Sequence, residues 1–126
     1  MNIRVIVVVV AAAVALVAGA PAHATTSGWR TSILGQSHTP LAGSPWAYYV
    51  RAWGPDGKPW HGAIVIEVVT TRGKKIDGVG MFGFDGSALR AYIWRRADKG
   101  LTLDLRITFI EGTKKVGTTS YRVSVK

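Results

Sequence analysis

Apolar and polar side chains alternate with a period of two over much of the chain, beginning near residue 33. Such alternation is typical of β-strands that bury one face. It is clearest over residues 46–53 and 101–110, and no segment keeps the 3.6-residue period of an amphipathic helix. The pattern therefore predicts an all-β domain. In these two runs the residues expected on the buried face are Trp46, Tyr48, Val50, Ala52, Leu101, Leu103, Leu105, Ile107 and Phe109.

Short stretches that favour turns separate the alternating runs. The segment Pro55-Asp56-Gly57 offers a fixed φ, a turn-forming side chain and a residue that accepts positive φ, so it predicts a hairpin. A single sheet would leave an apolar face in water, and we therefore expect two packed antiparallel sheets. The seven predicted strands lie near residues 33–40, 46–53, 62–71, 75–80, 88–94, 101–110 and 116–125. The other residues expected in the core are Ile64, Ile66, Val68, Leu89, Ala91, Ile93, Tyr121, Val123 and Val125.

The beginning of the chain has the pattern of an export signal. Arg4 supplies a positive charge, residues 5–20 are uncharged and mostly apolar, and Ala22-His23-Ala24 fits the small-x-small pattern that signal peptidase cleaves. Because no later stretch is apolar enough to span a membrane, cleavage after Ala24 would yield a secreted protein. Retention of the apolar run as an anchor helix is the alternative. The expected divisions are a signal peptide over residues 1–24, a flexible leader over 25–32 and one domain over 33–126.

The strand and turn pattern resembles that of a known family. The stretch from Pro40 to Val68, with its Gly-Pro-Asp-Gly-Lys-Pro turn, and the stretch from Leu101 to Val125 are similar to strands of bacterial extracellular immunoglobulin-like domains. The resemblance covers residues 33–126 and implies a seven-stranded immunoglobulin-like β-sandwich that acts as a spacer, adhesion unit or binding module. The chain has no cysteine, so the inter-sheet disulfide of antibody-type domains is absent.

The sequence offers little for catalysis or metal binding. Beyond the signal it has two histidines, His38 and His61, and it lacks the Gly-x-Ser-x-Gly elbow of serine hydrolases. A small secreted hydrolase remains an alternative that would need one of them beside a serine and a carboxylate. Cysteine is absent, the histidines are not closely spaced, the acids are scattered and no phosphate-binding loop occurs. We expect a non-enzyme without a metal or cofactor.

Charge is the more informative feature. The chain has 16 Lys and Arg against 7 Asp and Glu, and 15 of the cations lie beyond the signal. Since successive loops of a sandwich alternate between its ends, two of the cationic groups should share one end, with Lys114 and Lys115 at the other. Such an end predicts binding of anionic cell-envelope polymers rather than nucleic acid, whereas the alternative is that the charges only maintain solubility. The six residues expected there are Arg72, Lys74, Lys75, Arg95, Arg96 and Lys99.

The chain has five tryptophans, and two of them flank the predicted hairpin turn. Trp53 and Trp60, together with Tyr49, would form an exposed aromatic surface for a carbohydrate or another extracellular protein. The alternative is that the two indoles pack on each other across the hairpin. Trp94, next to Arg95, is either a core residue or a cation–π platform. A free sheet edge that pairs with another chain is a further possibility.

Overall fold

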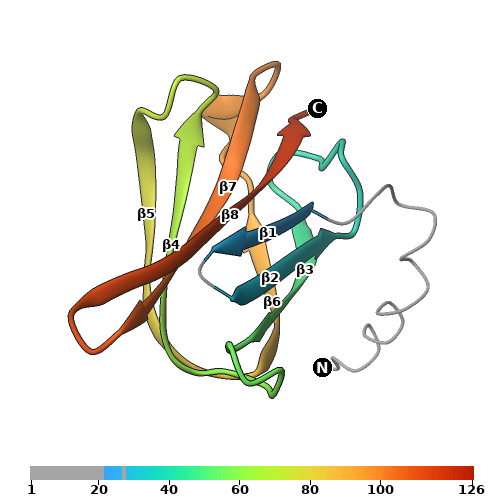
Figure 1. Ribbon diagram of the computed structural model, residues 1–126. Helices are drawn as coiled ribbons and strands as arrows, with labels where there is room; N and C mark the ends of the chain where they lie inside the picture. Colours follow the sequence, from blue (N-terminus) through green and yellow to red (C-terminus); the bar gives the residue numbers. More distant parts are fainter. Residues whose placement is uncertain (1–21, 27) are drawn as a thin grey trace.

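Figure 1 shows a computed structural model of the protein, in which residues 22–26 and 28–126 are described. The described chain is almost entirely β-structure, with one short 3₁₀ helix, η1, at Arg96–Asp98. None of its helices is long and apolar enough to cross a membrane. The strands are β1 (Ala22–Thr26), β2 (Trp29–Gly35), β3 (Pro45–Trp53), β4 (His61–Thr70), β5 (Lys75–Asp85), β6 (Ser87–Ile93), β7 (Thr102–Glu111) and β8 (Lys114–Ser124).

The strands form a sandwich of two antiparallel sheets. Hydrogen-bonded neighbours follow the order β1-β2-β3-β6-β5-β4-β7-β8, but β5 and β6 pair only at Asp85 and Ser87. The order therefore divides there into one sheet of β1, β2, β3 and β6 and a second sheet of β5, β4, β7 and β8. Gly86 makes this corner with a φ of +85°, and a Cβ at that position would lie 2.9 Å from Pro59 Cβ. Only glycine meets both conditions without strain.

The predicted all-β sandwich of antiparallel strands is confirmed, and most strand positions agree with the alternation of side chains. The first strand is the exception, because β2 spans Trp29–Gly35 instead of residues 33–40. The expected leader, residues 25–32, contains the end of β1 and the first half of β2, which pair with each other. Residues 1–21 of the expected signal lie outside the described residues. The expected cleavage point after Ala24 lies within β1.

The core between the sheets contains most of the residues predicted for it. Trp46, Tyr48, Val50 and Ala52 of β3 are buried, and the inward residues of β4, β7 and β8 are buried as well. Leu101 is the exception among these runs, because it precedes β7 and is 46% exposed. Alternation over five or more residues was thus sufficient to identify the buried face of the four strands that make most of the core.

The predicted orientation of β6 was wrong. Leu89 and Ile93 are 43% and 56% exposed, while Trp94, just after the strand, is fully buried. The inward positions belong instead to Arg90 and Tyr92: the Arg90 guanidinium lies 3.6 Å from the centre of the Phe82 ring, and the Tyr92 hydroxyl donates a 2.5 Å hydrogen bond to Asp77. Because β6 is the last strand of its sheet, its inward side chains face β5 and solvent at the open side, where long amphipathic side chains are accommodated.

Aromatic side chains form two separate clusters in the core, one toward each end of the sandwich. The first surrounds Trp46, whose ring centre lies 5.4 Å from that of Trp94. The second surrounds Trp60, whose ring centre lies 5.7 Å from that of Phe109. The first cluster consists of Trp46, Tyr48, Tyr92, Trp94 and Tyr121, with the exposed His38 stacked on Tyr121 at its edge, and the second of Trp29, Trp60, Phe84 and Phe109.

Candidate functional site

Two of the predicted cationic groups lie at the same end of the sandwich, which we call the basic end (upper part of Figure 1). It comprises the β4–β5 turn, the connection from β6 to β7 through η1, the loop over 36–44 and the last residues of the chain. Thr70, the last residue of β4, pairs with Leu103 at the start of β7. The 36–44 loop joins the same end, because the Gly43 amide donates to the Trp94 carbonyl at 2.8 Å.

The carboxylates nearest the basic end are already engaged. Asp98 is buried and accepts two hydrogen bonds from Arg95, at 2.8 and 2.9 Å. Asp104 accepts two from Arg122, at 2.9 and 3.0 Å, and Asp77 accepts from Tyr92. Glu67 lies 2.9 Å from Arg106 and 3.9 Å from Lys75. Four of the six predicted residues have no ion pair with a described carboxylate: Arg72, Lys74, Arg96 and Lys99.

Arg95 belongs to the internal structure of its loop. Its bidentate contact with Asp98 raises the pKa of the guanidinium and closes the turn that contains η1. Trp94 is fully buried, which places it in the core and not on a cation–π platform. Arg96 packs across the end, since a Cβ at Gly43 would lie 3.1 Å from its Cζ atom. The cations of this end therefore differ, because some support loops and others only face solvent.

The predicted aromatic surface is not brought together. Trp60 is only 5% exposed and belongs to the second aromatic cluster. Trp53 lies on the outer face of its sheet between two guanidinium groups, with Arg30 Cζ at 4.5 Å and Arg51 Cζ at 4.6 Å from its ring. Tyr49 is partly buried on that same outer face. The alternative of a Trp53–Trp60 pair is not formed either, because Trp53 pairs with Pro59 through the backbone.

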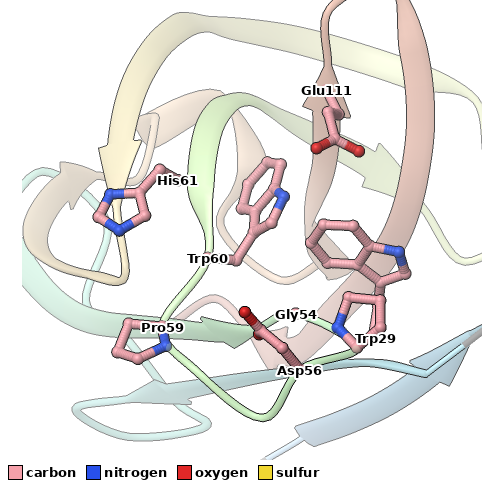
Figure 2. Close-up of a pocket in the computed structure, with 8 residues that line it drawn as sticks. Trp29, Gly54, Asp56, Pro59, Trp60, His61 and Glu111 are labelled. Atoms are coloured by element: carbon pink, nitrogen blue, oxygen red, sulfur yellow. The ribbon is translucent and has the colours of Figure 1, made fainter.

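An open pocket lies at the opposite end, which we call the pocket end. Its volume is about 530 Å³. Figure 2 shows the Trp60 indole between the imidazole of His61 and the indole of Trp29, with the Glu111 carboxylate above them. The β3–β4 loop, the first residue of β2 and the last residue of β7 provide the walls. The lining residues are Trp29, Gly54, Pro55, Asp56, Pro59, Trp60, His61 and Glu111.

The two histidines of residues 28–126, His38 and His61, have different surroundings. His61 lies on the surface, and its Nδ1 contacts the carboxylate of Asp85, its partner across β4 and β5. His38 stacks on Tyr121, its Nδ1 lies 2.7 Å from the Arg122 carbonyl, and its Nε2 lies 3.0 Å from the Tyr121 hydroxyl. No serine hydroxyl of residues 28–126 hydrogen-bonds to either imidazole, and no group of three His, Asp or Glu gathers there as a metal site.

Sequence reasoning did not identify the two residues that shape the pocket end most. Trp29 was assigned to the leader, yet its ring meets Trp60 edge to face with centres 5.2 Å apart. Glu111 directly follows the predicted strand 101–110 and was not singled out, but its carboxylate lines the pocket and has no hydrogen bond or ion pair with any described residue. A large aromatic residue in an otherwise polar segment was the available signal for Trp29. The chain matches no protein-family model and none of the curated proteins.

Proposed function

We propose that this chain is a secreted, non-catalytic immunoglobulin-like module that binds anionic polymers of the cell envelope through its basic end. The strand order, with β2, β3 and β6 facing β5, β4, β7 and β8, is compatible with an immunoglobulin-like sandwich. The export pattern of residues 1–24 supports a location outside the membrane. The bacterial origin that this proposal includes rests only on the resemblance of the sequence to bacterial extracellular immunoglobulin-like domains.

One observation carries the proposal: four cations at one end have no carboxylate partner in the described chain. Arg72 and Lys74 lie on the β4–β5 turn, whereas Arg96 and Lys99 lie on the β6–β7 connection. The carboxylates nearby are already paired or hydrogen-bonded, so they do not cancel this field. Exposed cations on separate loops suit a ligand that presents many anionic groups in succession, such as a polymer of phosphates or acidic sugars.

The matched test compares the two ends at equal change of charge. The protein is produced from its full-length sequence in a host that exports it, and its retention on immobilised poly(glycerol phosphate) is measured over a series of salt concentrations. The test variant combines Arg72→Gln, Lys74→Gln and Lys99→Gln and spares Arg96, which packs on Gly43. The control combines Lys58→Gln, Lys114→Gln and Lys115→Gln at the pocket end, where these lysines are exposed and form no ion pair with a described residue.

The expected result is a selective loss. Exposed charge contacts contribute about 0.2–1 kcal/mol each, so the test variant should bind about 3- to 150-fold more weakly at low salt. It should also show a weaker dependence on salt, since fewer counterions are displaced. The control should lose much less. Equal losses in the two variants would mean that net charge alone governs retention, and would refute a basic-end site.

A further inference from the structure

We infer that the pocket end is a second binding site, and that it takes a neutral saccharide unit of a glycan. The pocket lies at the opposite end from the four unpaired cations, and its lining contains the carboxylates Asp56 and Glu111 but no Lys or Arg. It therefore suits a different ligand from the one proposed for the basic end. The inference depends on the shape and chemistry of the lining and not on the charge of the whole protein.

A rigid aromatic floor supports the pocket. The Trp60 ring contacts Trp29, Phe84 and Phe109, with ring centres 5.2–6.0 Å apart. It also lies directly over Gly62, where a Cβ would approach the ring to 2.3 Å. Glycine at this position lets the indole approach β4 closely, and three aromatic neighbours pack around its ring. A floor fixed before the ligand arrives lowers the entropy cost of binding.

The walls offer flat apolar surfaces that remain accessible. Trp29 is only partly buried, and Pro55 and Pro59 are exposed. Gly28 precedes Trp29 with a φ of +84°, and a Cβ there would lie 3.3 Å from Pro55 Cβ, so the two segments meet closely beside the pocket. A pyranose ring has apolar C–H faces that stack on such surfaces, as aromatic rings do.

The polar groups of the pocket are mostly hydrogen-bond acceptors. Glu111 has no hydrogen bond or ion pair with a described residue, and Asp56 uses only Oδ1, which accepts from the Lys58 amide at 2.9 Å. One donor is also present, since Trp60 Nε1 is buried at the floor without a partner in the described chain.

This combination selects the ligand class. Several carboxylate oxygens around one pocket require a ligand with several donors close together, and adjacent hydroxyls of a sugar meet that requirement. An anionic sugar would be repelled by Asp56 and Glu111. A proline-rich peptide would also suit the aromatic walls, but its prolines have no N–H to donate. A neutral hexose or N-acetylhexosamine unit is therefore the ligand that fits the lining best.

The test uses the protein produced from its full-length sequence in a host that exports it. Its five indole N–H signals are followed by ¹⁵N NMR while neutral oligosaccharides are added. The probes are hexamers of glucose, mannose and N-acetylglucosamine, with a proline-rich decapeptide as the competing ligand class. Binding of at least one saccharide at millimolar concentration should move the signals of Trp29 and Trp60. The signals of Trp46 and Trp94, in the other aromatic cluster, should stay in place.

Two variants distinguish saccharide binding in the pocket from non-specific binding elsewhere on the surface. Glu111→Gln changes an exposed side chain without a partner in the described chain, so it should keep the fold and weaken the saccharide about tenfold or more. Lys115→Gln, also exposed and near the same hairpin, is the control and should have no effect. Signals that move only with the peptide, or with none of the probes, would overturn the inference. The inference would also be overturned if the Glu111→Gln variant bound the saccharide as tightly as the parent protein does.

Discussion

The two ends of the sandwich are built on different kinds of aromatic packing. Under the basic end, the cluster around Trp46 includes three tyrosines; the hydroxyls of Tyr92 and Tyr121 are hydrogen-bonded, and that of Tyr48 is buried without a partner in the described chain. Under the pocket end, the cluster consists of Trp29, Trp60, Phe84 and Phe109, none of which ionises. One half of the core therefore contains ionisable side chains, and the other half contains none.

The contrast extends to the surface. At the basic end most nearby acids are engaged by arginine or tyrosine, and the unpaired groups are cations. At the pocket end the Glu111 carboxylate is unpaired and lines a hollow, whereas the unpaired lysines of that end, Lys58, Lys114 and Lys115, are not among the lining residues. A single small domain can thus present an electrostatic surface at one end and a shaped, acceptor-rich surface at the other, because loops at opposite ends vary independently on a common framework.

The largest effect is expected from a change that breaks the pocket end alone. In Gly62→Ala the new Cβ would lie 2.3 Å from the Trp60 ring and 2.8 Å from the Ile110 carbonyl oxygen, so the indole must move. Overpacking of this kind destabilises a core by about 1–3 kcal/mol. Urea unfolding should show that loss, and the Trp60 indole signal should shift while those of Trp46 and Trp94 do not.

Gly83→Ala is the matched control for that change. Gly83 lies on the neighbouring strand β5, and nothing lies within 4 Å of a Cβ placed there. The substitution should leave the free energy of unfolding nearly unchanged or raise it slightly, since alanine restricts the unfolded chain. If the two variants lost the same stability, close packing of Trp60 on β4 would not be what fixes the floor of the pocket.

Alkaline pH should affect the basic end selectively. Burial raises the pKa of Tyr48, Tyr92 and Tyr121, and for Tyr92 the hydrogen bond to Asp77 adds to the rise. The folded state therefore keeps these protons while the unfolded state releases them above pH ~10, so stability is retained below that pH and falls above it. The loss is at most about 1.4 kcal/mol per tyrosine and pH unit, and less for the partly exposed Tyr92.

The measurement is thermal unfolding between neutral pH and about pH 11. The midpoint should fall at the alkaline limit, and Tyr92→Phe should reduce the slope of that fall because it removes one titrating hydroxyl. Indole signals of the basic-end cluster should change before that of Trp60. A midpoint that does not depend on pH across this range would contradict the described burial of the three hydroxyls.

The smallest effect concerns a surface pair. Asp104→Asn removes the carboxylate that engages Arg122, and the side chain of this arginine is 59% exposed. Exposed pairs of this type contribute about 0–1 kcal/mol, so stability should change little. The freed guanidinium should nevertheless strengthen retention on poly(glycerol phosphate) by a few-fold at low salt, and saccharide binding at the pocket end should not change. Weaker retention would argue against electrostatic binding at the basic end.

The strands that carry most of the core could be predicted from alternation, whereas the orientation of β6 could not. In β6 the two faces are nearly equal in apolar content, because Leu89, Ala91 and Ile93 compete with Tyr92 and Trp94. The outcome depends on the position of β6 at the edge of its sheet, next to the open side, where Arg90 and Tyr92 find partners on β5. Local periodicity contains no information about which strand ends a sheet.

The candidate sites, too, were predictable only in part from the sequence. The grouping of cations on two loops at one end followed from loop alternation, but which of them are unpaired depends on long-range contacts such as Arg122 with Asp104. The pocket joins residues from β2, the β3–β4 loop and β7, and two of them, Trp29 and Glu111, are more than eighty positions apart. No pattern within a short window of sequence brings such residues together.

The division of the strands between the two sheets also constrains how the protein folds. The hairpins β2–β3, β4–β5 and β7–β8 form between neighbours in the sequence, but β3 pairs with β6 and β4 pairs with β7, each across two intervening strands. Neither sheet can be completed by local contacts, so chain closure should limit the rate of folding and place it in the millisecond-to-second range of sandwich domains. Until β7 joins β4, the hairpin of β4 and β5 has an unpaired edge, and this is the stage at which the chain is most open to association with another copy.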